Sequence, residues 1–476
     1  MDKFIRSVRL NKAACQGCIN CIKYCPTQAI RVHDGKAHII DKFCIDCGRC
    51  IRYCPHHAKI PSYDPLTVIN DYKYTVALPA PSLYAQYNNL TNVDIVLNAL
   101  LKLGFDDVYE VSAAAELVSE ISREYIKAHA DEGLFISSAC PSVVRLIRVK
   151  FPSLISRLLP IKPPVEVAAE IARKRAMEKT GLPSEDIGII FISPCPAKVS
   201  YAREPLGIDK SNIDKVVAIK DVYPLLLPLM TKDESQLQPL SASGRIGLGW
   251  GNAGGEVGGL LIDNYLAADG IINILRVLES LEDEKIHGLK FVELSACNGG
   301  CVGGTLTVEN AYVATTKTKR LLKYQPVSRN HLAITPEAEN IYWDDHVEYE
   351  PVFRLGNTFK ESLEMMSAVE ALTKTFPGLD CGSCGAPTCQ TLAEDIVRGE
   401  ATANDCIYVL REHISSLSRE IEQLSKTMNL SGDDQDENAR LLSDYIQTLT
   451  AELAEFGVPG KEEPHGTKNN PRTSGM

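Results

Sequence analysis

Between residues 70 and 310 the hydrophobic positions form short apolar runs, and helical patterns follow several of them. Five runs have the length and composition of buried strands that end in loops: 74–81, 106–112, 133–141, 186–196 and 290–301. Helical spacing follows in PSVVRLIRVK and in PPVEVAAEIARKRAMEKTG. This alternation predicts parallel β-sheets with helices packed outside them. Such sheets bind ligands beyond the carboxyl ends of their strands, and three of the expected strand ends carry a cysteine.

The C-terminal part of the chain has a purely helical pattern. Its apolar residues step by three and four, the a/d spacing of a heptad repeat, along Ile407, Leu410, Ile414, Leu417, Ile421, Leu424 and Met428. After the acidic break SGDDQDEN, a second stripe follows at Leu442, Ile446, Leu449, Leu453 and Phe456. Two interpretations stay open: two helices that pack on their own domain, or a short coiled coil that forms a homodimer and leads to a signalling protein. Residues 310–375 predict a helix near ESLEMMSAVEALTK and carry no functional signal.

Length and composition narrow the class of protein. A chain of 476 residues is long enough for two to four domains. It has no apolar run of about 18 residues and no signal-like apolar segment at its start, so we expect a cytoplasmic protein without a membrane span. The net charge of −11 argues against general nucleic-acid binding. In a reducing cytoplasm, sixteen cysteines indicate metal ligation rather than disulfides.

The first 60 residues are basic, with eleven Lys and Arg against four Asp and Glu. One explanation is that these cations compensate anionic thiolate clusters within the segment. The other is that they form a docking face for an acidic electron-transfer protein.

An internal repeat places eight of the cysteines. CQGCINCIKYCP at 15–26 recurs as CIDCGRCIRYCP at 44–55, and each copy has the spacing C-x2-C-x2-C-x3-C-P. This is the spacing of bacterial two-cluster ferredoxins, in which the fourth cysteine of each run ligates the other cluster. The pattern therefore predicts one 4Fe–4S cluster on Cys15, Cys18, Cys21 and Cys54. It predicts a second on Cys44, Cys47, Cys50 and Cys25, with a zinc ribbon as the alternative.

A third set lies near the C-terminus. Its four cysteines are spaced C-x2-C-x4-C-x16-C: Cys381, Cys384, Cys389 and Cys406. Glycines in DCGSCGAPTC allow the loop to approach a cube closely, and a helix at TLAEDIVRG returns the chain to the last cysteine. We predict a third 4Fe–4S cluster, with structural zinc as the rival. The segment resembles the small iron–sulfur domain attached to corrinoid methyl-transfer proteins.

The four cysteines left over form a fourth set of four: Cys140, Cys195, Cys297 and Cys301. Their contexts SSACPS, ISPCPAK and ELSACNGGCVGG resemble the three active-site motifs of iron–iron (FeFe) hydrogenases. With the ferredoxin-like repeat, the resemblance covers about residues 1–310. In this family such cysteines hold the H-cluster, a 4Fe–4S cube bridged to a two-iron unit that carries CO, cyanide and a dithiolate. By position, the bridging ligand is Cys301.

The resemblance also implies the residues around that cofactor. Lys198 matches the lysine that hydrogen-bonds a cyanide of the distal iron, and its alternative is an ordinary surface lysine. Gly300 and its neighbours allow the backbone close to the cofactor. Ala80, Pro81 and Ser82 resemble the turn that lines the same pocket.

The motifs depart from the family at the proton-relay position. The family has two adjacent cysteines in its first motif, and the first of them passes protons, but here Ala139 stands there and has no exchangeable proton. Ser193 and Ser295 replace the methionines of the second and third motifs, while Tyr201 and Val143 replace a glutamate and a tryptophan. Because positioned proton transfer is worth about 100- to 10,000-fold in rate, these departures predict slow turnover. With these departures, the chain resembles the sensory branch of the family.

We therefore expect an α+β ferredoxin-like module at 1–62, a two-lobed α/β H-cluster domain at 70–375 and a 4Fe–4S domain at 376–410. A helical signalling or dimerisation segment at 411–456 and a disordered tail at 457–476 complete the chain. The predicted reaction is H2 ⇌ 2H⁺ + 2e⁻, in the role of a hydrogen or redox sensor. Two alternatives remain: a fast ferredoxin-linked hydrogenase with another proton route through Ser138, Ser193 or water, and an iron–sulfur assembly protein without the two-iron unit.

Overall fold

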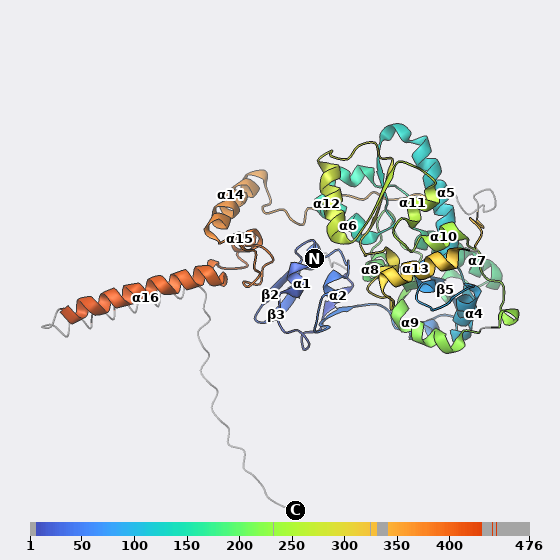
Figure 1. The fold of residues 1–476 in the computed structure, drawn as a ribbon, viewed down its shortest axis with the longest axis horizontal. Coiled ribbons are helices and arrows are strands. Elements are labelled where there is room, and N and C mark those ends of the chain that lie inside the picture. Colours follow the sequence, from blue (N-terminus) through green and yellow to red (C-terminus); the bar gives the residue numbers. More distant parts are fainter. Residues whose placement is uncertain are drawn as a thin grey trace, which may run out of the picture. The chain divides into compact units, whose positions relative to one another are not determined.

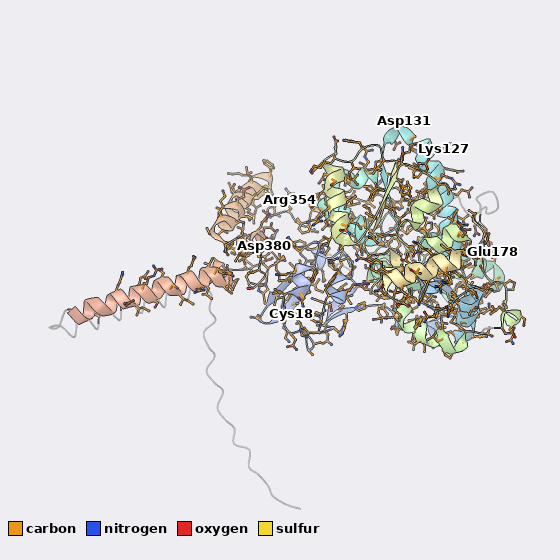
Figure 2. The ribbon with its side chains drawn as sticks, viewed as in Figure 1. Cys18, Lys127, Asp131, Glu178, Arg354 and Asp380 are labelled. Carbon is orange, nitrogen blue, oxygen red and sulfur yellow. The ribbon has the colours of Figure 1, made fainter. Side chains whose placement is uncertain are left out.

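The computed structural model describes residues 6–231, 233–323, 325–330 and 341–430 and the single residues 440 and 444. The chain divides into two compact units, Met1–Arg354 with Gly385–Pro387, and Leu355–Cys384 with Thr388–Met476. Arg354, the last residue of the first long stretch, is labelled in Figure 2.

The N-terminal module repeats one small motif twice. Two antiparallel pairs frame it, β1 (Val8–Leu10) with β4 (Lys59–Pro61) and β2 (Ile30–His33) with β3 (Lys36–Ile39). Each copy also has one short helix, α1 (Asn20–Lys23) or α2 (Arg49–Arg52), which carries the third cysteine of its run. The sequence repeat is thus a structural repeat as well.

A four-stranded parallel sheet forms the centre of the larger unit. Its strand order is β6-β5-β8-β9, with bounds Asp107–Val108, Tyr74–Pro79, Ile187–Ser193 and Lys215–Ala218. Side chains alternate between its faces, as the two-residue period of a strand requires. Val76 and Leu78 enter one core with residues of α7 (Pro164–Thr180), while Ala77 enters another with residues of α4 (Asp94–Leu103) and α9 (Ile219–Leu226). Both faces are covered, which explains why β8 reads as a continuous apolar run.

A second parallel sheet has the order β10-β11-β7, with bounds Tyr265–Asp269, Phe291–Ser295 and Phe135–Ile136. The predicted α/β layers are confirmed, but two strand predictions were too long. The run 106–112 supplies only the two residues of β6, because α5 (Val111–Ala128) begins within it. The run 133–141 supplies only β7, because the chain turns before α6 (Pro141–Lys150).

The remaining helices of this unit surround the sheets (Figure 1). They are α3 (Pro81–Tyr84), α8 (Pro196–Arg203), α10 (Arg245–Gly249), α11 (Gly255–Leu260), α12 (Ile271–Glu282) and α13 (Ala311–Leu322). None of the described helices is long and apolar enough to cross a membrane.

The second unit consists of helices among its described residues. They are α14 (Phe359–Thr375), α15 (Cys389–Val397) and α16 (Ile407–Leu430). Thr358 and Glu361 form a capping box at the start of α14, which confirms the helix expected there. On α16, Ile414 and Ile421 of the predicted stripe are 58% and 53% exposed. The coiled coil stays a prediction, and the second stripe at 442–456 and the tail lie outside the described residues.

Candidate functional site

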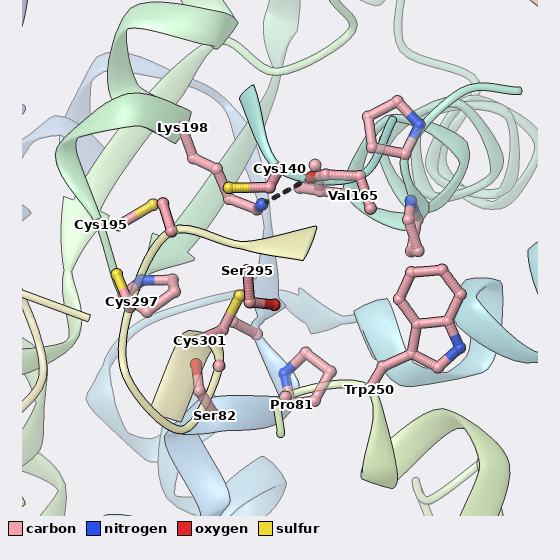
Figure 3. Close-up of a pocket in the computed structure, with 18 of the residues that line it drawn as sticks. Pro81, Ser82, Cys140, Val165, Cys195, Lys198, Trp250, Ser295, Cys297 and Cys301 are labelled. Atoms are coloured by element: carbon pink, nitrogen blue, oxygen red, sulfur yellow. Dashed lines mark hydrogen bonds between the residues drawn. The ribbon is translucent and has the colours of Figure 1, made fainter. Parts of the chain in front are cut away.

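One cavity collects residues from all three cysteine motifs. It has a volume of about 940 Å³ with its opening to solvent, and Cys140, Cys195, Cys297 and Cys301 line it together with Lys198. In Figure 3 these side chains surround a common space between the strand ends. The predicted fourth set of cysteines therefore lies at one place, although its members are up to 161 residues apart in the sequence (from 140 to 301).

Cys140 and Cys195 are placed by the same kind of local structure. Cys140 is the residue before α6 and Cys195 the residue before α8, and a proline follows each of them at the first helical position. Proline suits that position, because its fixed φ is helical and its missing N–H would be unpaired there anyway. A strand end, a cysteine and a proline-started helix thus present each sulfur at the carboxyl edge of the sheets.

The other two cysteines follow β11 in a tight glycine turn. Gly300 has φ +86°, and a Cβ on it would lie 2.4 Å from the backbone nitrogen of Ala253. A Cβ on Gly304 would lie 2.1 Å from the carbonyl oxygen of Pro194, the residue before Cys195. The glycines therefore let the turn with Cys301 pack directly against the second motif.

Burial favours the protonated form of the cysteine thiols in this cavity. Burial raises the pKa of Cys195 to about 12, against the lowering effect of Lys198, and burial also raises the pKa values of Cys297 and Cys301. Buried thiols of this kind ionise when a metal replaces the proton.

Lys198 is a cavity residue and not a surface residue. Its Nζ donates a hydrogen bond to the backbone oxygen of Ala139 at 3.2 Å (Figure 3). Burial by itself lowers the pKa of this lysine, but the surrounding sulfurs of Cys301, Cys195 and Cys140 outweigh burial and raise its pKa. The site therefore holds a cation that faces the space where an anionic group would lie.

The other predicted pocket residues are distributed as follows. Ala80, Pro81, Ser82, Ala139, Ser295 and Gly300 line the cavity. The Ser82 hydroxyl is fully buried and has no hydrogen-bond partner among the described residues, which fits a bound group that supplies one. Ser193 is not among the lining residues, and its hydroxyl donates a hydrogen bond to the backbone oxygen of Cys195 at 3.0 Å. The hydroxyl of Ser138 is similarly taken by the backbone oxygen of Ile161.

Two buried carboxylates line the same cavity and were missed from the sequence. Glu256 on α11 accepts a 2.6 Å hydrogen bond from Ser137, and Glu293 on β11 accepts hydrogen bonds from the backbone N–H groups of Gly254 and Val257. Burial raises the pKa of both carboxyl groups, and the neighbouring charge of Glu293 raises that of Glu256 further. Glu293 stands inside the ELSACNGGC motif, which could have drawn attention to it. Glu256 has no comparable sequence signal.

Two smaller cavities lie in the N-terminal module, and each holds one predicted cysteine set. One is lined by Cys15, Cys18, Cys21 and Cys54. The other is lined by Cys25, Cys44, Cys47 and Cys50. The grouping follows the interleaved pattern in which the fourth cysteine of each run joins the other set.

Three of the four predicted cysteine sets line cavities. No group of three or more Cys, His, Asp or Glu side chains in the described ranges converges on a single-ion site. In the second unit, Cys406 is buried and Cys381, Cys384 and Cys389 are half-buried around the start of α15.

Comparisons with known proteins agree with these motifs. Residues 73–261 and 230–305 match the family described as iron only hydrogenase large subunit, C-terminal domain. Residues 7–55 match a 4Fe-4S dicluster domain, and residues 376–408 match a putative Fe-S cluster family. Residues 73–305, about half of the chain, therefore match the iron-only hydrogenases, and the segments on both sides match iron–sulfur families.

Two curated hydrogenases match the chain at low identity. The chain is 22% identical over 291 residues to iron hydrogenase 1 of Clostridium pasteurianum, covering 49% of this chain and 50% of that protein. It is 23% identical over 354 residues to the NADP-reducing hydrogenase subunit HndD of Solidesulfovibrio fructosivorans, covering 62% of this chain and 56% of that subunit. The chain thus spans about half the length of the curated relatives it matches. A solved FeFe-hydrogenase HydA1 variant of Chlamydomonas reinhardtii aligns with a TM-score of 0.40 at 17% identity, over 52% of this chain and 84% of that one.

Proposed function

We propose that this protein is an FeFe hydrogenase that catalyses H2 ⇌ 2H⁺ + 2e⁻, with slow turnover suited to sensing hydrogen. One observation carries the proposal: a single cavity gathers four cysteines, the Lys198 ammonium and the Ser82 hydroxyl, which has no hydrogen-bond partner in the described part of the chain. Cysteines alone would suit any iron–sulfur cube. The added cation and hydroxyl suit a larger cofactor with anionic or polar ligands.

Each side chain of the cavity has a defined task in this proposal. Cys140, Cys195 and Cys297 would hold a 4Fe–4S cube, and Cys301 would hold the cube and the two-iron unit. Lys198 and Ser82 would fix that unit by hydrogen bonds, since both residues line the cavity. When bound, the two-iron unit supplies the position at which hydrogen is split or formed.

Electrons would leave through the N-terminal module. Cys47, a ligand of the second predicted cluster, lines the large cavity, and it also lines a smaller cavity with Cys297. Arg52 of the module donates to the backbone oxygens of Gly303 and Gly304 in the turn that carries Cys301. The second cluster would therefore be the neighbour of the H-cluster, and the first would lie farther along the module. With the set at 381–406, the protein would hold three 4Fe–4S clusters besides the H-cluster.

Protons would move by carboxylates in place of a cysteine. Ala139 occupies the relay position, and its N–H donates to the Ser137 hydroxyl at 3.3 Å. Ser137 in turn donates to Glu256, and Glu293 lies next to that carboxyl. The route would start at the Ser137 hydroxyl, which the backbone N–H of Ala139 contacts, because the side chain of Ala139 has no proton to pass to the cofactor. We therefore expect slow turnover.

An infrared spectrum tests the proposed function. Anaerobically matured protein should show bands of iron-bound CO and cyanide, and these should shift when argon is replaced by hydrogen. Absence of the bands, after maturation with a cofactor source proven on another hydrogenase, would leave an iron–sulfur cube alone and favour the assembly-protein alternative.

An Ala139→Cys variant tests the lost relay. The new thiol would line the cavity beside Ser137, so we expect hydrogen turnover to rise by about 100-fold, the lower end of what positioned proton transfer contributes. Hydrogen evolution per bound two-iron unit, counted from the infrared bands, measures the change. An unchanged rate would mean that proton delivery does not limit this protein.

A further inference from the structure

A buried lysine in the N-terminal module has no role in the function described so far. Lys59 is the first residue of β4 and only 2% exposed. Its ammonium nitrogen has no hydrogen-bond partner among the residues that the structure describes. Burial of an unpaired ammonium group is costly, and proteins compensate it with an opposite charge nearby.

The internal repeat shows that the fold does not need a lysine there. The two copies are offset by 29 residues, so Lys59 corresponds to Ile30 of the first copy. Both residues start a strand, and both are 2% exposed. The preceding Ala29 and Ala58 are buried as well. An apolar side chain fits this position in one copy, so packing does not explain the cation in the other.

The surroundings of Lys59 are the predicted cluster ligands. Lys59 lines the cavity that Cys15, Cys18, Cys21 and Cys54 also line; Cys18 is labelled in Figure 2. The N–H of Ala58, the residue before Lys59, donates a hydrogen bond to the sulfur of Cys54 at 3.2 Å, so the chain at Lys59 lies against a ligand of this set.

We propose that Lys59 is the counter-ion of the cluster held by Cys15, Cys18, Cys21 and Cys54 and that it raises the midpoint potential of this cluster. The proposal rests on the clusters of the proposed function but not on hydrogen activation. One electron converts the 2+ core to the 1+ core and makes the cluster with its four thiolates one charge more negative. A buried cation therefore stabilises the reduced form more than the oxidised form.

The consequence is a direction for electrons in the module. The second cysteine set reaches the large cavity through Cys47, whereas no cysteine of the first set lines that cavity. With Lys59 beside it, the first cluster would be the better electron acceptor of the two. Electrons released from hydrogen would then collect at the end of the module that is remote from the H-cluster.

The test is a redox titration followed by electron paramagnetic resonance on the full chain, produced with its iron–sulfur clusters but without maturation of the two-iron unit. Lys59→Ile introduces the residue that the first copy has at the same position, and Lys59→Arg keeps the charge. Lys12→Met is the matched control, because it removes one lysine charge from the same module at an exposed position. A Cys18→Ala variant identifies the transition of the first cluster.

In Lys59→Ile we expect the reduced-to-oxidised ratio of the first cluster at a fixed potential to fall at least tenfold, which is about 59 mV for one electron. Lys59→Arg and Lys12→Met should change this reduced-to-oxidised ratio little. An unchanged midpoint in Lys59→Ile with full iron content would overturn the proposal. Lys59→Ile could lose the first cluster altogether. In that case, a first cluster that Lys59→Arg still binds supports the counter-ion role, and loss of the cluster from both variants refutes that role.

Discussion

A Cys301→Ala variant should lose the hydrogen-responsive infrared bands completely while keeping its ferredoxin-like clusters. Cys301 would be the one residue that joins the cube to the two-iron unit, and its turn packs against the second cysteine motif through Gly304. Removal of that sulfur therefore leaves the two-iron unit without a covalent attachment. The measurement is the CO and cyanide absorbance per protein after maturation, together with iron content and the paramagnetic signal of the reduced N-terminal clusters.

Cys384→Ala is the matched control for this experiment. It also removes one predicted cluster ligand, but from the set in the second unit, so the CO and cyanide bands should persist. Bands of normal intensity in Cys301→Ala would contradict the assignment of the bridging ligand. Loss of the bands in both variants would indicate a general failure of cluster assembly.

A Glu256→Gln variant should lower hydrogen evolution by about 100-fold, the lower end of what positioned proton transfer contributes. Glutamine keeps the size of the side chain and its ability to accept the hydrogen bond from Ser137, but it cannot release and take up a proton. Burial and the neighbouring charge of Glu293 raise the pKa of Glu256, so its carboxyl group holds a proton at a higher pH than an exposed glutamate and is a suitable donor. The rate per bound two-iron unit is the quantity to measure.

Two serine variants distinguish this carboxylate route from a general disturbance of the cavity. Ser137→Ala removes the hydroxyl that contacts Glu256 and should also slow turnover. Ser138→Ala removes a hydroxyl that binds the backbone of Ile161 and should leave the rate unchanged. Equal losses of turnover in both serine variants would argue that the loop around Ala139 is sensitive to any change. An unchanged turnover in Glu256→Gln would contradict the carboxylate route.

The cysteine sets were predictable because their spacing is local chemistry. In the two N-terminal runs, C-x2-C-x2-C supplies three thiolates from one short turn whatever the rest of the chain does. The two proline-started helices after Cys140 and Cys195 are equally local, since a proline at the first helical position is compatible with any fold. The alternation of apolar runs and helical patterns likewise indicated parallel sheets before their order was known.

Only the tertiary structure brought together groups that have no common sequence signal. Ser137, Glu256 and Glu293 come from three separate segments, and their contact depends on how α11 packs beside β11. Lys59 appeared as one of many cations in a basic segment until its burial set it apart from the exposed ones. The adjacency of Cys47 to the large cavity follows from docking of the N-terminal module, which the repeat itself does not encode. Spacing along the chain determines ligands that share one turn, whereas a proton route or a counter-ion depends on distances across the fold.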